Sequence, residues 1–180
     1  MKDDNFWKDR YKDSWDAAAE KEEKIRKIVE RECKCECEYV GLGAGTTEYL
    51  PGTAKSRGYK KGGSDLHVKG TNIFIEVTGP NIERVGKDDP LWIRPDKIQN
   101  AIDHPKNDYW VVHVLKKDFY IRSIHMTEEF KKDFQKGIIK IVHPTIRFTE
   151  ETYAEVPANS KYVDEIDPML VAIRKTLGKQ

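Results

Sequence analysis

The N-terminal part of the chain has the apolar spacing of a helix. Trp7, Tyr11 and Trp15 recur at every fourth position, and a helical face continues through residues 18–32. The pattern predicts a helix here, while Ser14 leaves open whether a new helix begins at that point. The aromatic stripe favours burial in a core or at a dimer contact over stacking on bases.

Residues 33–39, CKCECEY, then alternate with period two. Cys33, Cys35 and Cys37 share one face and charged residues share the other, which predicts a strand. Side chains at every second position of a strand lie ~6.6 Å apart, too far for thiolates that all bind one zinc ion at ~2.3 Å. We therefore interpret the cysteines as small core residues. Residues 41–63, rich in glycine and basic side chains, are typical of a flexible loop.

Alternation resumes on both sides of Gly70-Thr71, in DLHVKGTNIFIEVT, which predicts a β-hairpin over residues 65–78. Gly70-Thr71 suits a two-residue type II′ turn, and a four-residue loop gives the same register. Residues that pair across such a turn have position numbers with a constant sum, so Asp65 faces Glu76. Directly opposed residues have Cβ atoms ~4.5–5.5 Å apart, which places two carboxylates side by side.

The rest of the pattern predicts further helices and strands. Helical periods follow Pro95, suited to a first turn, and Thr127 and Asp167, suited to N-caps. Apolar runs typical of strands occupy residues 109–115, 118–126 and 137–144. Loops are predicted for residues 79–90 and 145–161, which have no strong period. This order predicts an α/β protein with a central mixed sheet flanked by helices.

Composition limits the class of protein. The 180 residues suffice for a single domain with a core around a central sheet. Lys and Arg number 32 and Asp and Glu 31, so the net charge gives no reason to expect a nucleic-acid partner. Basic residues nevertheless cluster beside the hairpin, either as solvated loop residues or as phosphate contacts: Lys55, Arg57, Lys60, Lys61 and Lys69.

Three further features bear on location. No apolar run approaches the ~18 residues that cross a bilayer, so we expect no membrane partner. The charged N-terminus lacks the apolar stretch of a signal peptide. The three cysteines, an odd number, do not suggest a disulfide framework. Together these features predict a cytoplasmic, reduced protein.

The paired carboxylates of the hairpin need a compensating group. Like charges directly opposite each other destabilise a sheet, and ionised carboxylates are costly to bury beside Ile75 and Val77. A divalent cation would join Asp65 to Glu76, because Mg²⁺ takes carboxylate oxygens, backbone carbonyls and waters. An arginine or lysine from a neighbouring element would also serve, and exposure to solvent would remove the need.

The order of elements and two short motifs resemble the PD-(D/E)XK nuclease superfamily, the restriction-endonuclease-like fold. GSDLHV, with Asp65, matches its Asp motif, and IFIEVTG, with Glu76, matches its Glu-x-Lys strand. The glycine-containing VGLGAG before the hairpin is similar to the Holliday-junction resolvase and Mrr-like branch. The resemblance covers residues 17–126 and implies a core with the order helix-strand-hairpin-helix-strand. Residues 1–16 would then be an N-terminal helical extension and residues 127–180 a C-terminal extension.

The resemblance also implies a metal site. Carried over by position, Asp65, Glu76 and the backbone carbonyl of Val77 would hold Mg²⁺, with Mn²⁺ able to substitute. Such an ion activates a water that hydrolyses a phosphodiester, and in this family the product usually has a 5′-phosphate. The helix glutamate of the family corresponds best to Glu22, with Glu20 as the alternative, although both also match solvated helix charges.

The chain departs from the family pattern at Thr78, where the pattern has a lysine. Threonine can hydrogen-bond a water but brings no charge. Lys97, at the edge of the apolar face of the following helix, could supply the missing ammonium with its stem along that face. Gln99 flanks the other edge as a contact to the site or to the nucleic-acid backbone. Lys69 is too distant, and His67 is a base, a metal ligand or, more often in such a setting, a structural group.

We therefore expect a metal-dependent endonuclease that hydrolyses nucleic acid, with DNA as the expected substrate. A homodimer would place one active site on each of the two strands of a DNA duplex. The first alternative is a catalytically degenerate nuclease fold that binds nucleic acid through the basic residues between 55 and 69. The second is a protein-interaction domain whose aromatic N-terminal stripe forms the interface.

Overall fold

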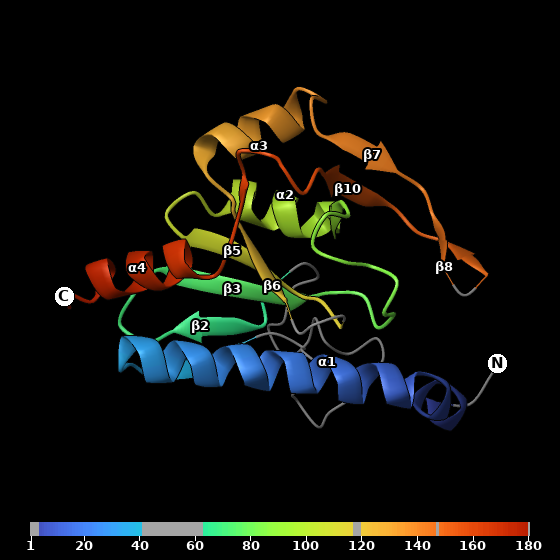
Figure 1. The fold of residues 1–180 in the computed structure, drawn as a ribbon, viewed down its shortest axis with the longest axis horizontal. Helices are drawn as coiled ribbons and strands as arrows, with labels where there is room; N and C mark the ends of the chain where they lie inside the picture. Colours follow the sequence, from blue (N-terminus) through green and yellow to red (C-terminus); the bar gives the residue numbers. More distant parts are fainter. Residues whose placement is uncertain (1–3, 41–62, 117–119, 147, 180) are drawn as a thin grey trace.

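The computed structural model describes residues 4–40, 63–116, 120–146 and 148–179, with side chains from residue 16 onward. The architecture is mixed α/β, as predicted, with helices on both faces of a central six-stranded sheet (Figure 1). None of the helices in this described part combines the length and apolarity that a bilayer span requires. The helices are α1 (Asp4–Cys33), α2 (Pro95–Asp103), α3 (Glu128–Gln135) and α4 (Asp167–Thr176).

The central sheet has the strand order β1-β2-β3-β5-β6-β11. Neighbouring strands are antiparallel except β3 and β5, which run parallel, so the sheet is mixed. A parallel pair needs a crossover connection, and α2 lies in that connection. The strands are β1 (Cys37–Tyr39), β2 (Leu66–Val68), β3 (Ile73–Thr78), β5 (Asp108–Val114), β6 (Ile121–His125) and β11 (Val163–Asp164).

One face of the central sheet is packed by α1 and α4. Ile25 and Val29 of α1 are fully buried in the same cluster as Met169 and Ile173 of α4 and the apolar side chains of β2, β3 and β5. Each such side chain stabilises the fold by roughly 1.5–3 kcal/mol relative to exposure. In Figure 1, α1 runs alongside β2 and β3. Because alternate side chains of the hairpin pack against α1 and α4, the remaining ones point to the opposite face of the sheet.

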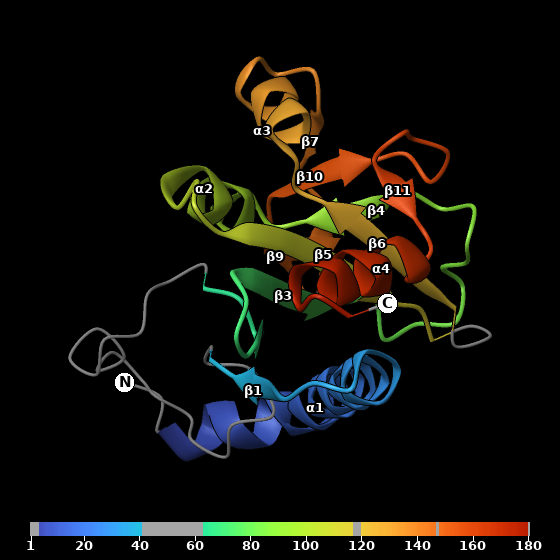
Figure 2. The ribbon, with the colours of Figure 1, turned by 90° about the vertical axis from the view of Figure 1, so that its left-hand side faces the viewer.

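The opposite face of the central sheet is covered by α2, α3 and a second sheet (Figure 2). Ile98 of α2 and Phe130 of α3 are fully buried in one cluster with Val111 of β5 and Ile124 of β6. The second sheet has the order β4-β10-β7, and a short hairpin, β8-β9, continues from it. These strands are β4 (Leu91–Ile93), β7 (Lys140–Val142), β8 (Thr145–Ile146), β9 (Thr149–Glu150) and β10 (Tyr153–Val156).

The β2-β3 hairpin has the predicted register but a different turn. Leu66 pairs with Ile75, and four residues connect the two strands. The N–H of Thr71 donates to the carbonyl of Val68 at 3.2 Å, and Gly70 has φ 78°. Gly70 is therefore the third residue of a turn that begins at Val68, and the predicted type II′ turn is wrong. The four-residue loop gives the register that was expected from either connection.

The boundary between α1 and β1 also differs from the prediction. α1 is one continuous helix that ends at Cys33, so the strand predicted for residues 33–39 begins only at Cys37. Lys34, with φ 50°, follows the helix in the left-handed conformation. Cys33 is 1% exposed, and its thiol contacts the carbonyl of Leu170 in α4 at 3.6 Å. Packing against α4 thus prevails over the local alternation.

The C-terminal third contains more strand than predicted. Residues 145–161, predicted to be a loop, contain β8, β9 and β10, and β4 lies where no strand was predicted. Asp167 is the first residue of α4 and not its cap, because the capping position is Ile166. The cap of α3 is confirmed: Oγ1 of Thr127 accepts the N–H of Phe130 at 3.2 Å. Strands this short show too few alternations for their period to be recognised.

Candidate functional site

The hairpin brings two acidic side chains together on the α2 side of the central sheet. Leu66 and Ile75 are the last pair of the β2-β3 ladder, and the N–H of Asp65 donates to the carbonyl of Ile75 at 3.2 Å, so Asp65 lies just beyond the ladder beside Glu76. Ile75 and Val77 point into the core on the α1 side. Because side chains alternate along a strand, Glu76 points to the other face. The structure therefore places Asp65 and Glu76 side by side.

The two carboxyl groups are in contact and largely shielded from water. Asp65 is 8% exposed and the Glu76 side chain 14% exposed. Burial raises the pKa of Asp65, and burial together with the negative charge of Asp65 raises the pKa of Glu76 well above its usual range. The two carboxyls interact electrostatically, and the N–H of Val77 donates to Oδ2 of Asp65 at 2.8 Å. The pair therefore retains a proton at pH values where an exposed carboxyl has lost it.

Lys97 of α2 supplies a positive charge to this pair. Its neighbours Ile98 and Ala101 are fully buried, which holds this edge of the helix against the sheet. Nζ of Lys97 donates to Oε2 of Glu76 at 2.8 Å and to the carbonyl of Gly63 at 2.6 Å. The ammonium lowers the pKa of both carboxyls and so opposes the effect of burial. It also ties α2 to the segment that enters β2.

The oxygen atoms of the pair suit a divalent cation that keeps water ligands. Within the described ranges, no group of three or more His, Cys, Asp or Glu side chains converges to hold a metal. Mg²⁺ is commonly bound through one or two carboxylates and completes its shell with waters. Asp65 and Glu76 provide two carboxyls, and the backbone carbonyl of Val77 follows Glu76 directly. A cation here would offset the free-energy cost of burying the two carboxylates in their ionised form.

Thr78 lies two residues beyond Glu76 on the same face of β3. It pairs with His113 of β5, which is 3% exposed. Burial lowers the pKa of His113 to about 4, so the ring is neutral and Nε2–H donates to the carbonyl of Trp92 at 3.0 Å. Thr78 thus has a neutral neighbour, and the ammonium at this site comes from Lys97.

Glu22 lies on the face of α1 that packs against the sheet. It is 3% exposed and shares this face with Ile25 and Val29, whereas Glu20 is exposed. The interpretation of Glu22 as a solvated helix charge is therefore wrong. A role for Glu22 beside the two hairpin carboxyls stays a prediction.

His67 is held on both sides of its ring. Nδ1 lies 2.9 Å from Oε1 of Glu38, and Nε2 lies 3.0 Å from the carbonyl of Thr71. The ring stacks on Phe74 with centroids 4.5 Å apart. Both nitrogens thus have partners away from the carboxyl pair. These contacts favour the structural interpretation over a base or a metal ligand.

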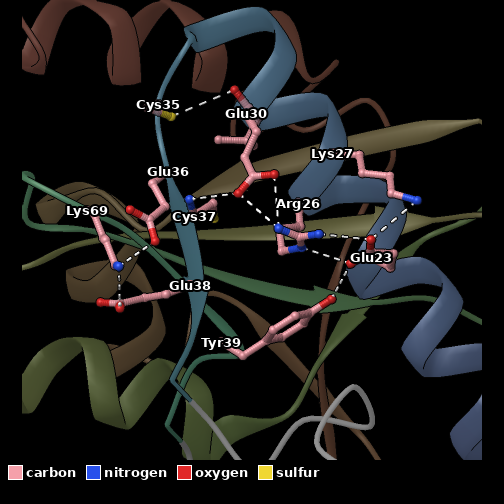
Figure 3. A network of polar contacts seen from close by, with 11 residues as sticks. Glu23, Arg26, Lys27, Glu30, Cys35, Glu36, Cys37, Glu38, Tyr39 and Lys69 are labelled. Atoms are coloured by element: carbon pink, nitrogen blue, oxygen red, sulfur yellow. Dashed lines mark hydrogen bonds and ion pairs between the residues drawn. The ribbon is translucent and has the colours of Figure 1, made fainter.

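Lys69 lies in the hairpin loop between two glutamates of the β1 region. Its Nζ is 2.5 Å from Oε1 of Glu36 and 3.6 Å from Oε2 of Glu38 (Figure 3). The same view shows Arg26 of α1 between two glutamates of its own helix. Each of these cations already has carboxylate partners, which weakens its attraction for a phosphate.

Of the other predicted nucleic-acid contacts, the structure describes Gln99, which does not join the site. Nε2 of Gln99 donates to Oδ1 of Asp103 at 2.8 Å on the exposed side of α2. Four predicted basic contacts lie outside the described residues: Lys55, Arg57, Lys60 and Lys61. The side chains of the aromatic stripe, Trp7, Tyr11 and Trp15, also lie outside them.

Lys21 of α1 connects the helix to the end of β3. Its Nζ donates to the carbonyl of Gly79 and to Oδ1 of Asn81, both at 2.7 Å, which joins α1 to the end of β3. Burial lowers its pKa to about 8. A side chain on Gly79 would clash with the carbonyl oxygen of Val114, 2.2 Å from an ideal Cβ. Among the charges of EKEEK nothing distinguished Lys21, because its partners are distant in sequence.

Comparisons with known proteins give little further guidance. No protein-family model and no curated protein matches the chain. Among solved structures, it is similar to one described as D212, a nuclease from a fusselovirus, with a TM-score of 0.44 and 15% sequence identity. The match covers 81% of this chain and 79% of that chain. Similarity at this level assigns neither a family nor an activity, so function has to be argued from the site itself.

Proposed function

We propose that this protein is a metal-dependent endonuclease that hydrolyses phosphodiester bonds of nucleic acid, with DNA as the expected substrate. The observation that carries the proposal is the contact between the shielded carboxyls of Asp65 and Glu76, with Nζ of Lys97 2.8 Å from Glu76. Two like charges on opposed strands destabilise a sheet, so folding alone does not explain them. Perturbed pKa values of this kind cluster at functional sites. The resemblance of the hairpin motifs to PD-(D/E)XK nucleases supports the same assignment.

Asp65 and Glu76 would hold Mg²⁺, or Mn²⁺ in its place, together with the backbone carbonyl of Val77. A bound cation supplies a water of lowered pKa and a positive charge beside the scissile phosphate. Because burial raises the pKa of both carboxyls, they give up their protons at a higher pH than exposed carboxyls do before they can act as ligands. The N–H of Val77 holds Oδ2 of Asp65, so this carboxyl keeps its orientation when the proton leaves.

Lys97 would take the part that the family assigns to a lysine at position 78. Its ammonium is held by Glu76 and by the carbonyl of Gly63, within reach of the pair. From there it would donate a hydrogen bond to a phosphate oxygen as negative charge develops. Thr78, on the same strand face as Glu76, would hydrogen-bond the attacking water.

Cleavage of supercoiled plasmid and of a synthetic four-way junction, in Mg²⁺, Mn²⁺ or EDTA, tests the proposal. We expect cleavage that requires metal and that falls at least about 100-fold in Asp65→Asn. The matched control is Asp103→Asn, which removes an exposed carboxylate from α2 and should cleave at the wild-type rate. Lys97→Ala should cleave about 100-fold more slowly, whereas Lys69→Ala should be unaffected.

Two results would contradict the proposal. Binding of both substrates without cleavage in any metal would indicate the degenerate, nucleic-acid-binding fold. Cleavage that persists unchanged in Asp65→Asn would place the activity elsewhere than at the hairpin pair.

A further inference from the structure

A two-stranded β-ribbon extends away from the body of the molecule. Val142 of β7 pairs with Tyr153 of β10, and the same register continues to Ile146 of β8 and Thr149 of β9. A backbone hydrogen bond of 2.9 Å between the two ladders keeps the strands in register. In Figure 1 the β8 end of this ribbon lies well clear of the helices and the central sheet. From Val142 to Ile146 the ribbon gains roughly 13 Å.

Phe148 lies at the tip of this ribbon in an unusual state. It is 98% exposed and has φ 67°. A bulky residue with positive φ is an outlier, because its Cβ crowds the neighbouring backbone. Glycine would relax the backbone here, and an exposed phenyl ring adds no burial. A two-residue connection between paired strands itself calls for positive φ, so folding explains the backbone conformation at this position but not the choice of an exposed phenylalanine.

The root of the ribbon is fixed to the strand that leads into α2. Trp92 of β4 stacks on Tyr153 with centroids 5.4 Å apart, and its Nε1 donates to Oε2 of Glu155 at 3.0 Å. β4 is followed almost directly by α2, the helix that carries Lys97. The root of the ribbon is therefore connected through β4 to the helix that carries Lys97.

We propose that Phe148 is a wedge that stacks on a base of nucleic acid where the duplex is opened, at a junction, bulge or kink. This inference rests on the proposed function and names its substrate class. A two-stranded β-ribbon fits the major groove, and apolar side chains can insert between base steps. Among the described residues of the ribbon, Lys140 is paired with Glu155 at 3.0 Å, and Glu150 lies close to the tip. The contact that Phe148 itself would make with nucleic acid is stacking.

Equilibrium binding of a fluorescent bulged DNA duplex in EDTA, where metal-dependent cleavage is absent, tests the wedge. Phe148→Ala should bind about tenfold more weakly than the wild type, as expected for the loss of one aromatic stack. The factor should be the same at low and high salt, because stacking releases few counterions. Phe148→Trp, which keeps a flat ring, should bind as the wild type does. Phe148→Gly, which relieves the positive φ, should bind as weakly as Phe148→Ala.

The control is Ile138→Ala, an exposed apolar residue outside the ribbon (65% exposed), which should leave the affinity unchanged. Equal affinities of wild type and Phe148→Ala would overturn the wedge. A self-association lost in Phe148→Ala, with DNA affinity unchanged, would overturn it too and make a second copy the partner. If the protein never cleaves but Phe148→Ala binds DNA tenfold more weakly, the wedge is supported and the proposed nuclease activity is not. If cleavage depends on Asp65 but Phe148→Ala leaves the DNA affinity unchanged, the nuclease activity is supported and the wedge is not.

Discussion

Two lysine–glutamate pairs lie along the same hairpin and differ in burial more than in distance. Nζ of Lys69 is 2.5 Å from Glu36, and the two side chains are 43% and 67% exposed. Nζ of Lys97 is 2.8 Å from Glu76, and these side chains are only 15% and 14% exposed. Water screens the shorter contact, while the longer one lies against a second carboxyl, that of Asp65. Burial and the additional charge, rather than contact length, distinguish the candidate site from an ordinary surface pair.

Removal of the lysine from the shielded pair should have the largest effect on stability. In Lys97→Ala, Glu76 loses its cation in a largely buried place, so we expect the free energy of unfolding to fall by roughly 3–5 kcal/mol. Urea denaturation monitored by circular dichroism at pH 7 measures this change. If Lys97→Ala lowers the free energy of unfolding no more than Lys69→Ala does, burial does not distinguish the two lysine–glutamate pairs.

His113, on the same face of the central sheet as Glu76, tests whether burial alone changes the free energy of unfolding by several kcal/mol. Its pKa is lowered to about 4 from 6.5, so between these values the unfolded chain binds a proton that the folded protein does not. Stability should therefore fall as the pH falls from 6.5 to 4, by about 3 kcal/mol in all at ~1.4 kcal/mol per pH unit. His113→Gln has no such group and should lose this part of the pH dependence. Urea denaturation of both proteins at pH 7 and pH 4.5 checks it, and parallel pH profiles would refute it.

Asp65→Asn should change stability in the opposite direction. The raised pKa of Asp65 means that the fold disfavours its charged form, so its contribution to stability decreases as the pH rises through the folded-state pKa. Asparagine removes the charge and can still accept the N–H of Val77. We expect the free energy of unfolding to rise by about 1 kcal/mol at pH 8, with no rise at pH 3. A variant that is less stable than the wild type at pH 8 would show that the carboxylate is not under strain.

Lys69→Ala should have the smallest effect. Its ammonium and its two glutamate partners are solvated, so their attraction is largely screened. The midpoint of urea unfolding should coincide with that of the wild type at pH 7. A clear shift, especially one that matches Lys97→Ala, would remove the distinction between the two pairs.

The parts of the molecule that sequence could predict are those set by local rules. The hairpin register followed from alternation on both sides of Gly70, which fixes Leu66 opposite Ile75 whichever turn connects the strands and so brings Asp65 to the side of Glu76. The position of Lys97 followed from the apolar face of its helix, marked by Ile98. In each case neighbours within a few residues determine where the side chain points.

The remaining features depend on contacts between distant segments. Cys33 belongs to a helix because α4 packs against it, although its own neighbours alternate like a strand. Lys21 acquires its partners only when α1 lies beside the end of β3, at Gly79. The strand around Ala154 is recognisable only through its pairing with β4 and β7. Local periodicity carries no information on such contacts.

Whether Asp65 and Glu76 form a metal site can be measured without any knowledge of the substrate. Calorimetric titration of Mn²⁺ into the wild type should show binding at one site that weakens as the pH falls, because protons compete with the ion for the carboxyls. Glu36→Gln, from the exposed pair, should bind Mn²⁺ as the wild type does, whereas Asp65→Asn should show no binding. Equal Mn²⁺ binding by Asp65→Asn, or no binding by the wild type, would contradict the assignment.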